Sequence, residues 1–351
     1  MDSRLISRML EEARQAPAAV RTLMSNDHER YAALVANLRE QPPHSVVTVA
    51  RGSSDHAAQF MSYLIMARLG RLVTSLPMSL LTVHHSPLDC AGLTCFAFSQ
   101  AGRSPDLIVP TEHIRRGGGR TVALVNADAS PLAAAAEWSL SLHAGPERSI
   151  AATKSHIAQL VAGARLVAEW QADEDLRKAL QTLPEALNTA VSADWSAALP
   201  VLVNAEHLFV IGRGSGLAIA AEAALKFKEV CGIQAEAFSA AEIKHGPMAL
   251  IGQGYPLLMF APRGPAQAGV LAIADEMCQR GARVLLVVPP ETAVGFHSPQ
   301  LTRLPLVATA AEDLDPISAI QSFYPMIEAL ARQRGRDPDQ PPHLAKVTCT
   351  L

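Results

Sequence analysis

The chain has 351 residues, and at roughly 150 residues per domain this length favours two domains. Its 30 lysines and arginines against 33 aspartates and glutamates give a net charge of −3, which excludes the basic bias of a nucleic-acid-binding protein. Hydrophobic residues make up 49% of the sequence, which is enough for a core in each domain and too much for a disordered chain.

Several features of the sequence indicate where the protein works. No apolar run approaches the roughly 18 residues that a membrane-spanning helix needs. Residues 1–14 are charged and amphipathic, unlike a signal peptide. The five cysteines are scattered without a C-x-x-C pair, which is typical of reduced thiols. We therefore expect a cytoplasmic protein that binds neither membrane nor nucleic acid.

An internal repeat divides the chain. Residues 46–58 read VVTVARGSSDHAA, and residues 209–221 read FVIGRGSGLAIAA. Each copy contains a β-branched apolar run, then Arg-Gly-Ser, then small residues that open a helix. Chance similarity between two strand–turn–helix units is the alternative, but the order of the elements after each copy also agrees.

Predicted strands and helices alternate after both copies of the repeat. We expect, in chain order, a strand at 93–99, a helix at 104–115, a strand at 120–126, a helix at 150–169, a strand at 255–261, a helix at 265–280 and a strand at 282–289. The strand candidates are continuous apolar runs, which is typical of parallel strands buried on both faces. The sequence therefore predicts an α/β protein with two doubly wound, flavodoxin-like parallel-sheet domains related by duplication.

The expected domain boundaries follow from these elements. We predict an N-terminal helix at 1–28, a first domain at 29–185, a linker near 182–195, a second domain at 196–336 and a tail at 337–351. The tail is rich in proline and has no clear period, so from composition alone it is either a frayed end or a segment laid across a site.

Three loops of the first domain are rich in hydroxyl groups, at residues 53–54, 99–104 and 153–155. Parallel α/β domains bind ligands where strands end and helices begin. Hydroxyls and backbone N–H groups at helix N-termini bind phosphate well. Ser53 and Ser104 could instead be ordinary N-caps, but three such loops at one edge favour a phosphate site.

The glycine pattern argues against a nucleotide cofactor. The run from Gly212 to Leu217 has leucine where the third glycine of a dinucleotide-binding motif belongs, and no P-loop occurs. A nicotinamide-dependent oxidoreductase is therefore disfavoured. The histidines also lack the spacing of a zinc site, and we expect no metal or organic cofactor.

The second half contains a reactive-looking set of side chains. Glu222, Lys226 and Glu229 share one face of a predicted helix at 220–230, a spacing that usually marks a solvated, salt-bridged face. His245 stands directly before a Gly-Pro turn, where it could move protons near neutral pH. A lone histidine is, however, more often structural.

Taken together, these motifs resemble the tandem sugar isomerase (SIS) domain family. The segments similar to the isomerase half of glucosamine-6-phosphate synthase are 220–250, the two Arg-Gly-Ser loops, Ser99-Gln100-x-Gly102, Glu147 with 152–154, and 339–346. The resemblance covers nearly the whole chain and includes no glutamine-hydrolysing domain. We therefore expect no ammonia release from glutamine, and a likeness to stand-alone SIS-type amino-sugar-phosphate deaminases.

The resemblance implies a role for each matching residue. Glu229 would move a proton between C1 and C2 with Lys226 beside it, and His245, from the neighbouring subunit, would open the sugar ring. Lys346 in the tail would close over the sugar. Ala101 replaces a serine that binds the phosphate in the synthase. The substrate-binding residues would be Gly52, Ser54, Ser99, Gln100, Ser104, Thr153 and Ala345.

The function that the resemblance implies is the isomerisation and deamination of a hexosamine 6-phosphate, giving fructose 6-phosphate and ammonia from glucosamine 6-phosphate. The enzyme would be a homodimer with shared active sites. One alternative is an aldose–ketose isomerase that releases no ammonia. Another is a non-catalytic module that senses sugar phosphates, which would need the phosphate loops but not Glu229, His245 and Lys346 together.

Overall fold

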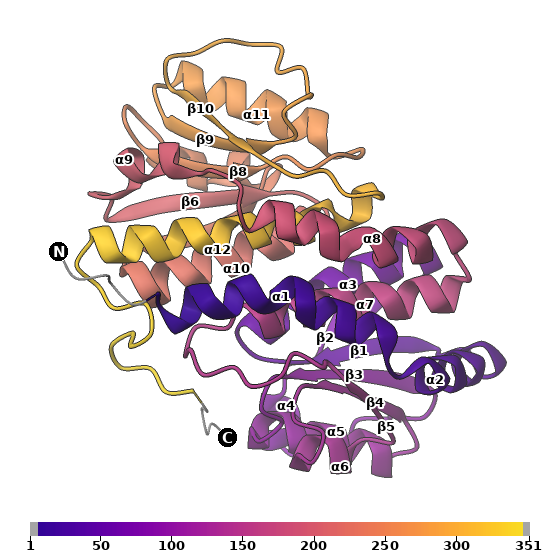
Figure 1. Ribbon diagram of the computed structural model, residues 1–351. Helices are drawn as coiled ribbons and strands as arrows, with labels where there is room; N and C mark the ends of the chain where they lie inside the picture. Colours follow the sequence, from indigo (N-terminus) through magenta and orange to yellow (C-terminus); the bar gives the residue numbers. More distant parts are fainter. Residues whose placement is uncertain (1–5, 347–351) are drawn as a thin grey trace. The chain divides into compact units, whose positions relative to one another are not determined.

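The computed structural model describes residues 6–346 (Figure 1). By its internal contacts the chain divides into two compact units, each built on its own five-stranded parallel sheet. Of the described residues, unit 1 holds those up to Pro17, Arg148–Thr153 and Thr182–Leu344, and unit 2 holds Ala18–Glu147, Lys154–Gln181, Ala345 and Lys346. Helix α1 (Arg8–Ser25) contributes residues to both units.

The sheet of unit 2 has the strand order β2-β1-β3-β4-β5, and every neighbouring pair is parallel. Its strands are β1 (Ser45–Val49), β2 (Val73–Ser75), β3 (Leu93–Ser99), β4 (Arg120–Val125) and β5 (Trp138–Ser141). The central strands are buried almost throughout, as expected for continuous apolar runs covered on both faces.

Helices cover both faces of this sheet (Figure 1). On one face α3 (Ser53–Leu69) packs against α7 (Lys154–Gln171), which is buried along nearly its whole length, and α2 (His28–Glu40) packs against α7. The other face is covered by α4 (Ser79–Thr82), α5 (Pro105–Arg116) and α6 (Pro131–Ala135). Their side chains share one apolar cluster with the strands, in which Leu107 and Ile114 of α5 pack near Val47, Cys95 and Ala123.

The sheet of unit 1 repeats the same topology. Its strands are β6 (His207–Gly212), β7 (Gln234–Ser239), β8 (Pro256–Phe260), β9 (Arg283–Val288) and β10 (Leu301–Pro305), in the order β10-β9-β8-β6-β7. Counted from the first strand of each unit, both sheets read 2-1-3-4-5, which is the flavodoxin-like order. The predicted fold class and the internal duplication are therefore confirmed.

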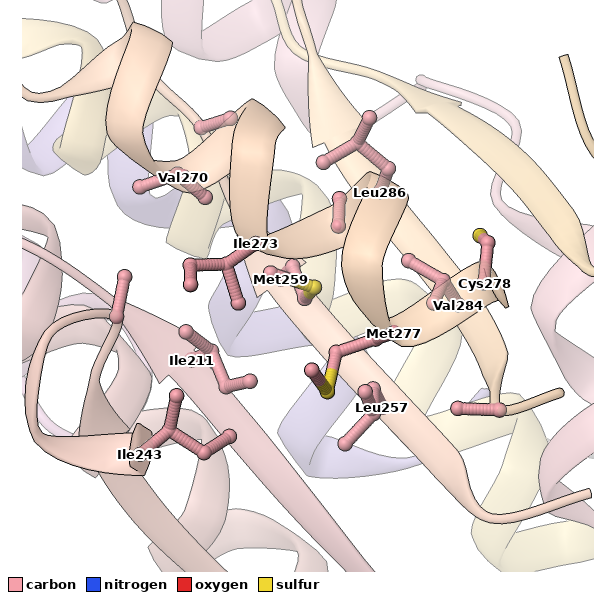
Figure 2. Packing of buried hydrophobic residues seen from close by; sticks show 14 of the residues in the cluster. Ile211, Ile243, Leu257, Met259, Val270, Ile273, Met277, Cys278, Val284 and Leu286 are labelled. Atoms are coloured by element: carbon pink, nitrogen blue, oxygen red, sulfur yellow. The ribbon is translucent and has the colours of Figure 1, made fainter. Parts of the chain in front are cut away.

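Helix α11 (Gln267–Gln279) closes one face of this second sheet. Figure 2 shows Ile273 and Met277 of α11 pointing toward Ile211, Leu257 and Met259 of the strands. Helix α10 (Gly216–Lys226) packs on β6 and β7, and it also packs on α12 (Asp315–Gln333); the short α9 (Leu199–Leu202) packs on α12. The sheet is thus covered by helices on both faces.

The linker expected near 182–195 is mostly helical. Helix α8 (Glu174–Ala190) runs through it, and the two compact units divide inside this helix, between Gln181 and Thr182, where the expected segment begins. Leu183, Leu187 and Ala190 recur at helical spacing and are buried, and their burial outweighs the helix-breaking tendency of Pro184 inside the helix. The long helix expected from residue 150 begins at Lys154.

Residues 6–346 include no helix with the length and apolar character that a membrane crossing requires. Within the same range, histidine, cysteine, aspartate and glutamate side chains form no group of three that could hold a metal ion. The four cysteines described as free, Cys90, Cys95, Cys231 and Cys278, are all buried.

Candidate functional site

Two loops of unit 2 lie at the point where the strand order of its sheet reverses. The loop after β1 leads into α3 on one face, and the loop after β3 leads into α5 on the other face. In open α/β sheets this divergence opens a crevice at the carboxyl ends of the strands, where ligands bind. The structure brings to this edge the predicted residues Gly52, Ser54, Ser99, Gln100 and Ser104.

The loop after β3 is held in a fixed shape from within. The Ser99 hydroxyl accepts a hydrogen bond of 2.9 Å from the Gly102 N–H. Gly102 has φ +63°, and a Cβ atom there would lie 2.2 Å from the Ser130 hydroxyl, so only glycine fits. Ser104 stands at the N-cap of α5, but its side chain makes no capping hydrogen bond. Ser104 therefore occupies the N-cap position but lacks the side-chain hydrogen bond of an ordinary N-cap.

An ion pair with one buried partner ties the two loops together. Arg51 donates from Nε and Nη2 to the same carboxylate oxygen of Asp106, at 3.1 and 2.9 Å. Asp106 is buried in the first turn of α5, whereas the Arg51 side chain remains 57% exposed. Sequence reasoning missed this role of Asp106, because an acidic residue in a first helical turn is also the ordinary complement of the helix dipole.

Two side chains of helix α7 make polar contacts with the loop after β1. Gln159 Nε2 donates to the Ser54 hydroxyl at 2.9 Å, and His156 Nδ1 lies 2.9 Å from the Ser53 carbonyl oxygen. Both α7 side chains are buried. Because the Ser54 oxygen accepts from Gln159, its own O–H remains to be donated to a ligand. The signal that could have revealed this support is the pair His156 and Gln159, two polar residues three apart and thus on one face of the helix.

The C-terminal tail is anchored as far as Lys346. The Asp339 carboxylate accepts hydrogen bonds of 2.8 and 2.9 Å from the first N–H groups of α1, at Arg8 and Met9. Lys346 Nζ lies 3.3 Å from Oε2 of Glu147, and both residues, like Ala345, belong to unit 2. These contacts argue against a frayed end for the described part of the tail; residues 347–351 lie outside the described residues.

In unit 1, Lys226 forms a buried cluster with two carboxylates. Its Nζ lies 2.6 Å from Glu229 Oε2 and 3.2 Å from Glu222 Oε1. The Glu222 and Lys226 side chains are fully buried, while that of Glu229 is 19% exposed. The solvated-face interpretation of these three residues is therefore wrong. Of the two carboxylates, only Glu229 reaches solvent.

A π-helical turn places Glu229 beside this lysine. Helix α10 ends at Lys226, and the next five residues, Phe227–Cys231, form the π-helix η2. π-helical turns are rare and frequent at functional sites. The turn is packed on α12, and Phe227 meets Phe323 of that helix edge-on with ring centroids 5.4 Å apart.

The charge of Lys226 is set by two opposing effects. Burial alone would lower the pKa of Lys226, but the carboxylates of Glu222 and Glu229 together raise it above its ordinary value. Lys226 therefore carries its positive charge at neutral pH. Its ammonium lies 2.6 Å from the Glu229 carboxylate and holds that group in position.

His245 and Thr153 lie outside this cluster in unit 1. His245 ends the 3₁₀ turn η3 (Glu242–His245) and is exposed. Gly246 follows with φ +139°, and Pro247 opens the next 3₁₀ turn, η4 (Pro247–Leu250), so the turn predicted after His245 is confirmed. Thr153 stands directly before α7 and is fully buried.

Comparison with known proteins gives a family match along most of the chain. The model of the SIS domain matches residues 41–168 and 201–292. The glutamine–fructose-6-phosphate aminotransferase (isomerizing) of Corynebacterium efficiens is 30% identical over 360 residues, which cover 96% of this chain and 57% of that protein. The chain thus spans little more than half the length of this relative.

Solved structures agree with this match. A protein of Silicibacter pomeroyi DSS-3, proposed to be a phosphosugar isomerase, is 41% identical and superposes with a TM-score of 0.89, covering 95% of this chain and all of that one. Glucosamine-6-phosphate deaminase of Thermotoga maritima has a TM-score of 0.76 over 98% of this chain and all of that one, at 22% identity. The second likeness concerns the fold alone.

Proposed function

Because this chain belongs to the SIS domain family, we propose that it is a phosphosugar isomerase acting on a hexosamine 6-phosphate. The observation that carries the proposal is the buried Lys226–Glu229 pair, whose carboxylate alone reaches solvent. An aldose–ketose shift needs one carboxylate that takes a proton from one carbon and returns it to the next. We assign this step to Glu229, with the Lys226 ammonium 2.6 Å away holding its carboxylate in position.

The loops of unit 2 suit the phosphate of such a substrate. Ser54 has a hydroxyl proton to donate, Ser104 stands at a helix N-terminus without capping it, and Arg51 adds an exposed guanidinium. A dianionic phosphate is stabilised by hydroxyl donors, helix N-termini and arginine. We propose that Gly52, Ser99 and Gln100 complete this phosphate site.

For an amino sugar the reaction would proceed in two steps. Glu229 removes the C2 proton of the open-chain aldose and delivers it to C1, while a proton passes from the amino nitrogen to O1, which leaves a C1 alcohol and a C2 imine. Water then adds at C2 and ammonia leaves, so that glucosamine 6-phosphate and water give fructose 6-phosphate and ammonia. We assign ring opening to His245 of the neighbouring subunit in a homodimer, and carbonyl contact to Lys346.

Release of ammonia separates this proposal from its nearest alternative. We expect the protein to release ammonia from at least one of glucosamine 6-phosphate and galactosamine 6-phosphate in a coupled assay. Conversion of the neutral hexose 6-phosphates without ammonia release from either amino sugar would favour a simple aldose–ketose isomerase. Binding of the same sugars without any turnover would favour a sensor.

A further inference from the structure

Glu147 is a buried acid at the start of the most buried helix of unit 2. Its carboxylate accepts a hydrogen bond of 3.0 Å from the Ser155 N–H and another from the Ser155 hydroxyl. The Glu147 side chain is fully buried, and the Lys346 ammonium, 27% exposed, lies 3.3 Å away. An acid that receives the first N–H groups of a helix also gains from the helix dipole.

The same turns of α7 also hold the loop after β1. The Ser155 hydroxyl contacts Glu147. The neighbouring His156 contacts the Ser53 carbonyl oxygen, and Gln159 contacts the Ser54 hydroxyl. All three α7 side chains are buried. A short stretch of helix therefore connects the tail lysine to a serine of the candidate phosphate site through polar contacts inside one unit.

We propose that Glu147 is a positioning residue that holds the Lys346 ammonium, and that the first turns of α7 keep this carboxylate in place. The Ser155 N–H and hydroxyl hold the Glu147 carboxylate independently of the tail, so the carboxylate is already in place to receive the Lys346 ammonium. An ion pair with one partner fully buried is screened less by water than a surface pair. The effect on turnover rests on the proposed function, whereas the effect on the tail does not.

Trypsin tests the contact without any substrate, because it must take the Lys346 side chain into its own pocket to cleave after it. We expect trypsin to cleave between residues 346 and 347 about tenfold faster in Glu147→Gln than in the wild type. The cleavage is measured by intact-mass spectrometry over time. Glu112→Gln is the matched control, since Glu112 pairs with Arg116 on the surface of α5 and its replacement should leave the rate unchanged.

A second variant covers the case in which Glu147→Gln does not fold. Glu147→Asp keeps the charge but withdraws the carboxylate by one methylene, so its cleavage rate should lie between those of the wild type and Glu147→Gln. Wild-type rates of cleavage after Lys346 in a folded Glu147→Gln, or in Glu147→Asp if only that variant folds, would overturn the proposal.

Kinetics distinguish positioning from general support of the fold. We expect Glu147→Gln to lower kcat about tenfold with little change in KM, and to have no further effect in a Lys346→Met background, because it acts through that lysine. If the two substitutions lowered kcat independently, so that their effects multiplied in the double variant, the positioning role of Glu147 would be refuted. If the wild type turns over no sugar phosphate, the proposed function fails, while the trypsin result still decides the contact.

Discussion

Glu229→Gln is expected to lower kcat by about 10³-fold while leaving the KM for the sugar phosphate within about threefold of the wild type. The amide occupies the same space as the carboxylate beside Lys226 but cannot accept a proton from carbon. Steady-state kinetics with the preferred sugar phosphate, together with a direct binding measurement, would show loss of turnover with binding retained.

The matched control for this variant is Glu206→Gln. Glu206 is an exposed carboxylate directly before β6, at the edge of the sheet opposite the carboxyl ends of the strands. Its replacement should leave kcat and KM unchanged. A Glu229→Gln variant with wild-type kcat would remove Glu229 from the mechanism.

Lys226→Met is expected to lower the free energy of unfolding by about 3–5 kcal/mol. The change leaves the fully buried Glu222 without the cation that lies 3.2 Å from it. Urea denaturation would measure the loss. Lys228→Met, two residues further along and exposed, is the control and should change stability by less than about 0.5 kcal/mol. Equal stability of Lys226→Met and wild type would contradict the buried-pair account.

The pH dependence of the two proteins should differ. Because the pKa of Lys226 is raised in the folded chain, its contribution to stability is fully present below its ordinary value of about 10.4 and is lost only as the pH rises through the folded pKa. The wild type should therefore lose none of this contribution between pH 6 and 9. Lys226→Met lacks this contribution at every pH, so the loss at high pH should appear in the wild type alone.

Much of the architecture could be predicted because buried parallel strands are continuous apolar runs. The expected strand at 93–99 coincides with β3, and the two Arg-Gly-Ser loops follow β1 and β6, the first strands of the two units. The segment at 182–195 begins where the two units divide, as expected, but the burial of Leu183, Leu187 and Ala190 that makes most of it helical depends on tertiary packing.

The site was only partly predictable for the same reason. Spacing placed Glu222, Lys226 and Glu229 on one face, but whether that face meets water depends on packing against α12, which follows much later in the chain. The pairs Arg51–Asp106 and Glu147–Lys346 join residues far apart in sequence, and no local sequence pattern predicts such contacts.

The most direct test of the central claim is proton exchange at carbon. The wild-type protein is incubated in D₂O with its hexose or hexosamine 6-phosphate substrate, and NMR follows deuterium at C1 of the ketose and C2 of the aldose. We expect the wild type to introduce deuterium, and we expect Glu229→Gln to introduce it about 10³-fold more slowly. Deuterium incorporation by Glu229→Gln at the wild-type rate would contradict the account.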